Sequence, residues 1–185
     1  TYTIIVRDAN GCTFTTTATI SNASGPTALV TSSTNSTCGN SNGTLTIGAV
    51  TGGVAAYTYS VNGSAFTATT SYTGLAAGTY TVIVRDVNGC TFTTTATVVN
   101  TPGPTALAIT TVNSTCGNSN GTVTIGAVTG GLAPYTYSFN GSAFTATTNY
   151  TAVAAGTYTV IVKDANGCTF NTTVTVINNP GPTAL

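Results

Sequence analysis

The chain repeats itself at a fixed interval, and no other feature constrains its fold as strongly. Residues 27–104 align with residues 105–182 without a gap, and most of the aligned positions are identical. All five cysteines keep the interval, in the series Cys12, Cys90 and Cys168 and in the pair Cys38 and Cys116. Near-identical modules build length or multiply weak contacts, whereas a catalytic site needs no such repetition. The repeat therefore favours a structural or binding role over catalysis.

The repeat also predicts the domains. Residues 1–26 match the end of the unit, so we expect them to be the C-terminal strands of a partial repeat. Full repeats are expected at 27–104 and 105–182, and residues 183–185 match the start of a further one. Pro-containing junctions between units restrict the chain more than a Gly/Ser linker would. Because both ends match interior junctions, we expect the sequence to be part of a longer array.

Ionised side chains are almost absent. Three basic and three acidic residues give a net charge of zero, and there is no His. They form three adjacent pairs, Arg7–Asp8, Arg85–Asp86 and Lys163–Asp164. The chain has no basic face for nucleic acid, no polybasic patch for a membrane surface and no apolar run of transmembrane length. With no His or Glu as a base and one Asp per repeat, we expect no enzyme activity, metal or cofactor.

Alternating apolar and polar residues predict β-strands throughout. The predicted strands are residues 44–47, 57–61, 79–84, 91–99, 106–112 and 157–162, with a weaker one at 65–72. Asn-Gly and other Gly-containing pairs separate them, and Asn-Gly closes tight hairpins because both residues tolerate positive φ. About seven short strands per unit joined by turns are typical of an antiparallel β-sandwich. We therefore predict an all-β chain of tandem immunoglobulin-like repeats, each with one disulfide.

One tyrosine per unit fits this fold class in particular. Tyr2, Tyr80 and Tyr158 each stand at the start of a predicted strand, directly after a sharp corner where the corner lies within the sequence. Immunoglobulin-like domains place a tyrosine corner at this point, with the hydroxyl hydrogen-bonded back to the main chain. We predict a tyrosine corner at all three positions.

The cysteines of a nearly uncharged, Thr-rich chain favour an oxidising, extracellular setting. The simplest pairing is one bridge per unit, Cys38 to Cys90 and Cys116 to Cys168, with Cys12 paired to a cysteine upstream. A bridge from Cys90 to Cys116, between neighbouring units, is the alternative. Zinc binding is disfavoured because the sequence lacks His and has no closely spaced second Cys.

Two further side-chain patterns each have two interpretations. Asp86 and Asn88 could contribute to a calcium site, but calcium prefers six to eight oxygen ligands and the unit has one carboxylate, so a local turn is favoured. The pairs Tyr57/Tyr59 and Tyr135/Tyr137 could form an aromatic sugar-binding strip. Alternation puts both members of a pair on one face of a strand, and we expect that face to be core.

The order of these motifs resembles the SprB-type repeat of giant cell-surface adhesins of gliding Bacteroidetes. The motifs are Thr37-Cys38, Gly52-Gly53, Tyr57-Thr-Tyr-Ser60, Ala77-Gly-Thr-Tyr80 and Asp86-Val-Asn-Gly-Cys90, and the pattern recurs from Thr115-Cys116 to Cys168. The resemblance implies an extracellular immunoglobulin-like repeat, exported to the cell surface, in adhesins that bind substrata or polysaccharide. Family members often carry a Trp in the Tyr-x-Tyr-Ser strand and have more acidic residues. This chain has no Trp and few acidic residues, and that difference favours a stalk over a sugar-binding unit.

We therefore expect a structural repeat of a long extracellular adhesin or surface fibre at the cell surface. Its partners would be neighbouring repeats of the same chain, with other copies of the chain, surface polysaccharide or a substratum as further candidates. One alternative is a laterally assembled filament, since uncharged Thr-rich faces do not repel one another. The other is a carbohydrate- or ice-binding repeat. Neither nucleic-acid binding nor membrane insertion is expected.

Overall fold

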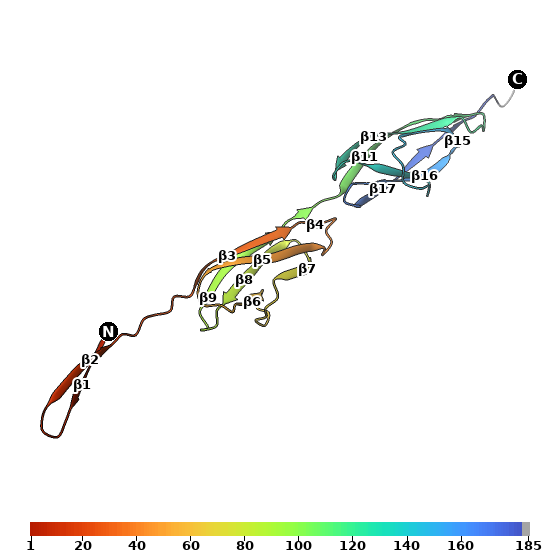
Figure 1. The fold of residues 1–185 in the computed structure, drawn as a ribbon. Helices are drawn as coiled ribbons and strands as arrows, with labels where there is room; N and C mark the ends of the chain where they lie inside the picture. Colours follow the sequence, from red (N-terminus) through yellow and green to blue (C-terminus); the bar gives the residue numbers. More distant parts are fainter. Residues whose placement is uncertain (183–185) are drawn as a thin grey trace. The chain divides into compact units, whose positions relative to one another are not determined.

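The computed structural model describes residues 1–182, and every regular element in this part of the chain is a β-strand (Figure 1). The predicted all-β class is confirmed. Residues 183–185, predicted to begin a further repeat, lie outside the described residues. Among the described residues, no helix has the length and hydrophobicity that crossing a membrane requires.

The chain divides into two compact units. The first comprises residues 1–32, 46–70 and 80–96, and the second comprises residues 33–45, 71–79 and the chain from residue 97 onward. The division passes through the first repeat, so the second unit contains the whole second repeat together with the segment around Cys38. The repeat boundaries at 27–104 and 105–182 stay a prediction from the sequence.

The first repeat carries eight strands. They are β3 (Pro26–Thr34), β4 (Ser36–Thr37), β5 (Gly43–Gly52), β6 (Thr58–Val61), β7 (Ser71–Leu75), β8 (Gly78–Arg85), β9 (Thr91–Val98) and β10 (Asn100–Thr101). One sheet has the order β3-β5-β7 and another has the order β6-β8-β9. The short strands β4 and β10 pair in parallel, Ser36 opposite Asn100 and Thr37 opposite Thr101.

The second repeat carries the same eight strands. They are β11 (Pro104–Val112), β12 (Ser114–Thr115), β13 (Gly121–Gly130), β14 (Thr136–Phe139), β15 (Asn149–Val153), β16 (Gly156–Lys163), β17 (Thr169–Val176) and β18 (Asn178–Asn179). The sheets are β11-β13-β15 and β14-β16-β17, both antiparallel, and β12 pairs in parallel with β18.

This strand order is that of an immunoglobulin-like sandwich. If the long strands of one repeat are named A, B, C, E, F and G in chain order, one sheet contains A, B and E and the other contains C, F and G. Immunoglobulin constant-type domains divide their strands in the same way, with a D strand added to the first sheet. The predicted immunoglobulin-like antiparallel architecture follows from this connectivity.

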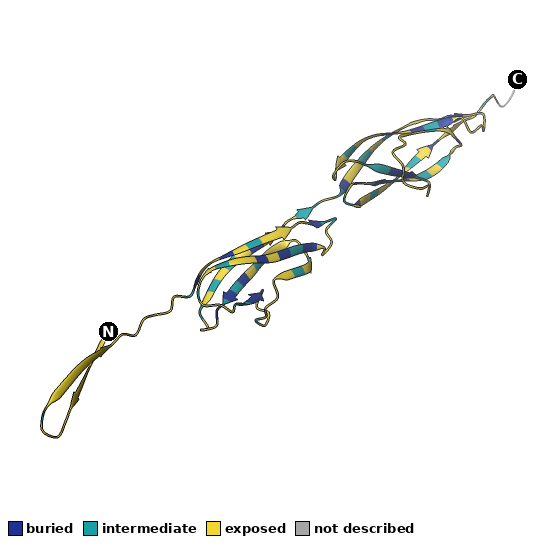
Figure 2. Ribbon diagram, viewed as in Figure 1, coloured by how far each residue is buried: buried dark blue, intermediate teal, exposed yellow. Residues whose placement is uncertain are grey.

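The core of the second repeat lies between its two sheets. Ile125 of β13 packs with Tyr137 of β14 and with Val160 and Val162 of β16, and both valines are fully buried. Buried residues alternate with more exposed ones in the first half of β13 and along β16, as Figure 2 shows. This alternation is the period of two that the sequence displays, because successive side chains of a strand point to opposite faces of the sheet.

The first strands show what the core requires. β1 (Tyr2–Arg7) and β2 (Thr13–Ala18) form a two-stranded antiparallel hairpin that matches β8 and β9 in sequence. Ile4 is 46% exposed, whereas its repeat equivalent Val82 is fully buried. An aliphatic residue at this position of the strand is therefore core only where the facing sheet is present.

One predicted strand is wrong. Residues 65–72 do not form a continuous strand, and only β7, which starts at Ser71, remains of it. Before β7, Thr67 makes a single isolated bridge to Tyr59. The hydroxyl of Ser60 donates to the carbonyl of Ser64 at 2.6 Å, and this bond closes the loop that leads into this segment.

Candidate functional site: a disulfide between consecutive repeats

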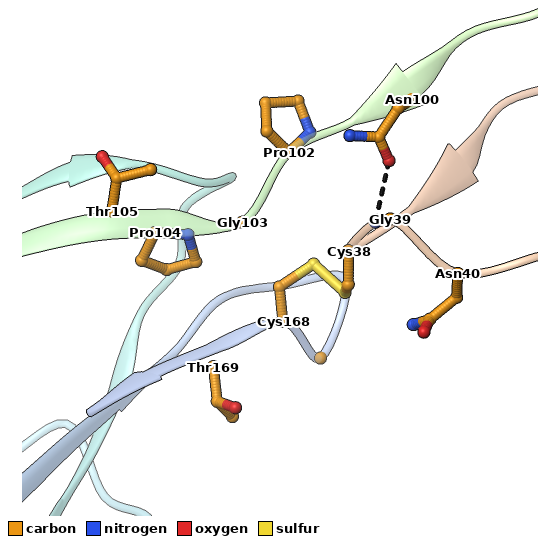
Figure 3. Close-up of a pocket in the computed structure, with 11 residues that line it drawn as sticks. Cys38, Gly39, Asn40, Asn100, Pro102, Gly103, Pro104, Thr105, Cys168 and Thr169 are labelled. Carbon is orange, nitrogen blue, oxygen red and sulfur yellow. Dashed lines mark hydrogen bonds between the residues drawn. A yellow bond between two sulfur atoms is a disulfide. The ribbon is translucent and has the colours of Figure 1, made fainter. Parts of the chain in front are cut away.

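The structure contains a disulfide that the sequence did not predict. Cys38 is bonded to Cys168, with 2.03 Å between the sulfurs and 5.3 Å between the Cα atoms, across 130 residues of sequence (Figure 3). The predicted pairs Cys38–Cys90 and Cys116–Cys168 are wrong, and the alternative Cys90–Cys116 does not form, since Cys12, Cys90 and Cys116 are free. The bond joins a cysteine of the first repeat to one of the second.

The predicted pairing within each repeat is wrong because the two cysteines of a repeat lie at opposite junctions. The N–H of Cys38 donates to the carbonyl of Thr101, at the end of its own repeat. Cys90 instead lies against Gly25, at the start of that repeat, where a Cβ on the glycine would be 2.7 Å from the Cys90 Cβ. The spacing of Cys38 and Cys90 in the sequence carries no information on which junction each one approaches.

The Cys38 half of the site is a tight loop fixed by asparagine side chains. Cys38 has a φ of 58°, in the left-handed region that non-glycine residues rarely adopt. The N–H of Gly39 donates to Oδ1 of Asn100 at 2.9 Å, as Figure 3 shows. The N–H of Thr37 donates to Oδ1 of Asn42 at 2.8 Å. These bonds hold the loop between β4 and β5 in a conformation that directs Cys38 toward the next repeat.

The Cys168 half of the site is a turn organised by one carboxylate. Oδ1 of Asp164 accepts the N–H groups of Cys168 at 2.8 Å and Asn166 at 2.9 Å. Oδ2 of Asp164 accepts the N–H of Leu132 at 3.1 Å. Asp164 is 5% exposed, so three amide donors replace the water that this carboxylate loses on folding. The turn between β16 and β17 thereby presents Cys168 at the junction.

The junction segment between β10 and β11 leaves no room for a side chain beside the bridge. A Cβ on Gly103 would lie 2.5 Å from the Cβ of Cys168, a distance that real contacts do not reach. Pro102 and Pro104 flank the glycine and fix φ on either side of it. The junction and both cysteines line a shallow pocket of about 560 Å³. Its lining of glycine, proline and asparagine offers no charged group to a ligand.

The turn interpretation of Asp86 is supported, because both carboxylate oxygens accept main-chain N–H groups. Oδ1 of Asp86 accepts the N–H groups of Asn88 at 3.0 Å and Cys90 at 2.9 Å, and Oδ2 accepts that of Val54 at 3.1 Å. Within the described residues there is no group of three or more His, Cys, Asp or Glu placed to hold a metal ion. The neighbouring Arg85 has a different partner from Asp86. Its guanidinium lies over the ring of Phe66, 4.1 Å from the ring centroid.

Tyr59 and Tyr137 are core residues, as expected of the strand face that they share with Tyr57 and Tyr135. Tyr59 and Tyr137 are each 7% exposed, and burial, followed by the neighbouring Tyr57 or Tyr135, raises the pKa of both phenols above the ordinary value of 10.0. The hydroxyl of Tyr135 donates to the carbonyl of Gly130 at 3.0 Å. Tyr57 and Tyr135 are partly buried, so one tyrosine of each pair belongs to the core.

A hydrogen bond of the kind expected for a tyrosine corner is present at Tyr158. The hydroxyl of Tyr158 donates to the carbonyl of Ala154 at 3.0 Å, four residues upstream. Tyr158 also lies beside an aromatic hollow that the sequence did not indicate. Phe139 stacks on Tyr150 at 4.5 Å and on Tyr158 at 5.1 Å between ring centroids, and these rings line a pocket of about 550 Å³. For Tyr2 and Tyr80 the corner stays a prediction.

The strand order and the cysteine arrangement define a tandem immunoglobulin-like β-sandwich protein. The family model described as "SprB repeat" matches residues 30–66 and 108–144, one segment in each full repeat. This match confirms the resemblance to the SprB repeat found in the sequence.

Solved structures give weaker likenesses. Murine CEACAM1b is 12% identical, with 81% of this chain and all of that one covered, at a TM-score of 0.36. The eight N-terminal Ig domains of Down Syndrome Cell Adhesion Molecule isoform 1.30.30 are 12% identical, with 82% of this chain and 25% of that one covered, at a TM-score of 0.33. Neither adds to the argument from strand order. No curated protein matches the chain.

Proposed function

We propose that this chain is a structural segment of a long extracellular adhesin or surface fibre, in which the repeats act as a stalk. The observation that carries the proposal is the Cys38–Cys168 bond, which joins one repeat covalently to the next. A disulfide of this kind persists in an oxidising compartment, which supports an extracellular or cell-surface location. The SprB repeats at residues 30–66 and 108–144 support the same class of protein.

The bond changes how the chain responds to tension. Force that reaches Cys38 passes through the two sulfurs to Cys168, so the main chain between them is not stretched. The 130 residues of this loop correspond to about 450 Å of extended chain at roughly 3.5 Å per residue. An adhesin stalk must transmit force without lengthening, and the bond removes most of the length that unfolding would release.

Single-molecule force spectroscopy tests this role. The chain is held by its two ends and stretched, first oxidised and then with a reductant. We expect reduction to add about 450 Å to the contour length, given roughly 3.5 Å per residue. Equal lengths in the two states would contradict the proposal. Light scattering separates the stalk from the laterally assembled filament, because a stalk segment stays monomeric and a filament subunit associates with little dependence on salt.

A second candidate function is carbohydrate binding in the second repeat, and one observation favours it. The hollow lined by Phe139, Tyr150 and Tyr158 is apolar and open, and aromatic rings bind the apolar faces of sugars. The first repeat has Val61 in place of Phe139. A glycan array with the chain and with Phe139→Val, which copies the first repeat, tests it. Binding that Phe139→Val abolishes would support it, and absence of binding by the parent chain would remove it.

A further inference from the structure

Cys116 lies in an environment that matches the Cys38 half of the bridge. Its φ is 53°, against 58° at Cys38. Its N–H donates to the carbonyl of Asn179 at 2.9 Å, as that of Cys38 does to Thr101 at 3.1 Å. The next N–H, of Gly117, donates to Oδ1 of Asn178 at 2.9 Å, the bond that Gly39 makes to Asn100 in the completed site. The Cys116 half-site therefore has the same conformation and hydrogen bonds as the Cys38 half of the bridge, and the sulfur of Cys116 is free and exposed.

Cys90 matches the Cys168 half in the same way. Its N–H donates to Oδ1 of Asp86 at 2.9 Å, as that of Cys168 does to Asp164 at 2.8 Å. A Cβ added to Gly25 would lie 2.7 Å from the Cβ of Cys90. A Cβ added to Gly103 would lie 2.5 Å from that of Cys168, so both glycines are packed closely against their cysteines. Cys90 thus has the surroundings of a bonded cysteine, and its sulfur is free.

The glycine near the end of the second repeat completes the comparison. A Cβ on Gly181 would lie 3.4 Å from Sγ of Cys116. The Pro-Gly-Pro segment of residues 180–182 thus lies beside Cys116, and its equivalent at residues 102–104 lines the pocket that holds the completed bridge. Cys116 therefore stands at the junction that follows its repeat, and Cys90 at the junction that precedes its own.

We propose that Cys90 and Cys116 are open half-sites, and that each forms a disulfide with the complementary cysteine of a further repeat of the same chain. Cys116 takes the second cysteine of a repeat that follows, and Cys90 takes the first cysteine of a repeat that precedes. The two thiols lose two electrons and two protons, and a small-molecule disulfide accepts them and leaves as two thiols. This inference rests on the Cys38–Cys168 bond and not on the adhesin role.

The consequence is a set of overlapping covalent loops. The loop closed by Cys38–Cys168 contains Cys90 and Cys116, so each neighbouring loop would begin or end inside it. Tension entering at Cys90 would need to stretch only the short segment from Cys90 to Cys116 before it reached the next bridge. Each repeat would be bonded to both neighbours, and unfolding would release no length beyond short segments of this kind.

A chain extended by one repeat tests the proposal directly. A copy of residues 105–182 is added after residue 182, the protein is oxidised with glutathione disulfide at low micromolar concentration, and a non-reducing peptide mass map is recorded. We expect Cys38–Cys168 together with a bond from Cys116 to the second cysteine of the added repeat, in a monomeric protein. Stretching should then show two length increments on reduction instead of one.

Two variants serve as controls. Serine at the second cysteine of the added repeat should leave Cys116 free and Cys38–Cys168 intact, whereas serine at the first cysteine of the added repeat should change neither bond. A bond from Cys116 to Cys168 or to Cys90 in the extended chain would overturn the proposal. So would bonds between separate chains in place of the bond within the chain, because they would assign the half-sites to association of copies.

Discussion

Asp164 and Cys168 are joined by a hydrogen bond of 2.8 Å from the cysteine N–H to the carboxylate, and the same bond recurs at 2.9 Å between Asp86 and Cys90. The rare acidic residue of each repeat is therefore the residue that holds the second cysteine in place. The two carboxylate oxygens of Asp164 accept three amide N–H groups, which gives this residue a structural role.

Asp164→Asn should weaken the second repeat. The amide has one acceptor oxygen where the carboxylate has two, and hydrogen bonds to a charged group contribute about 1.5–3 kcal/mol each. We expect a loss of about 2–4 kcal/mol on that basis, measured as a lower denaturant midpoint of the second repeat. Asp8→Asn in the exposed hairpin is the matched control and should leave the midpoint unchanged. Equal stability of Asp164→Asn and the parent would contradict the assignment.

Cys38→Ser should destabilise the chain where Cys90→Ser does not. Closing a loop of 130 residues removes entropy from the unfolded chain worth about 5 kcal/mol in the loop-closure model. Thermal unfolding without reductant should show a lower midpoint for Cys38→Ser and an unchanged one for Cys90→Ser. With reductant present, the difference between the two variants should disappear. If Cys90→Ser alone lowered the midpoint, the pairing would be wrong.

Gly103→Ala should impair the junction. The added Cβ would meet the Cβ of Cys168 at 2.5 Å, so main chain or bridge must move. Overpacking of this kind costs about 1–3 kcal/mol, and we expect slower formation of the Cys38–Cys168 bond in a glutathione buffer. Gly126→Ala is the control, because its Cβ would lie 3.5 Å from Ala108, an ordinary contact. Parallel kinetics for the two variants would count against a close-packed junction.

Stability should fall as the pH rises above 10. Burial raises the pKa of Tyr59 and Tyr137 above 10.0, so the unfolded chain loses these protons at a lower pH than the folded chain does. The stabilisation is complete below pH 10 and is lost as the pH rises toward the folded-state pKa. Melting curves from pH 8 to about 11 would show it. The double variant Tyr59→Phe, Tyr137→Phe should show a shallower decline, and an equal slope would contradict the assignment.

The Arg85 side chain should act through Phe66 and not through an ion pair. Its guanidinium lies 4.1 Å from the ring centroid, and Lys163 occupies the same place over Phe144 at 4.2 Å. Arg85→Gln should cost about 0.5–1 kcal/mol, the usual size of an exposed cation–π contact. Arg85→Lys, which copies the second repeat, should cost less. The two variants are compared by denaturant titration, and a loss that 1 M salt removes would favour an ion pair.

Much of the architecture was accessible from the sequence. Alternation located most strands, because side chains of a strand alternate between faces and burial selects one of them. The Asp-x-Asn-Gly-Cys turn was also accessible, since an aspartate that accepts nearby amide N–H groups is a local arrangement. The strand predicted at residues 65–72 was wrong because alternation does not register pairing, and before β7 Thr67 makes an isolated bridge to Tyr59 in place of a continuous ladder.

The cysteine pairing was not accessible. Cys38 and Cys90 share a repeat, and pairing within a module is the simplest choice when only the spacing is known. Which sulfurs meet depends on the end of the sandwich at which each cysteine lies, and that is fixed by contacts distant in sequence, Cys38 with Thr101 and Cys90 with Gly25. The aromatic hollow at Phe139 was missed for the same reason, since its rings come from three separate strands.

The sequence by itself determined the repeating unit, its β-strands, its turns and its near absence of charge, because each of these is set by residues close together in the chain. Only the tertiary structure decided that the bridge runs from Cys38 to Cys168. A disulfide forms between sulfurs that the folded chain brings within bonding distance, and here the sandwich places the two cysteines of each repeat at opposite junctions.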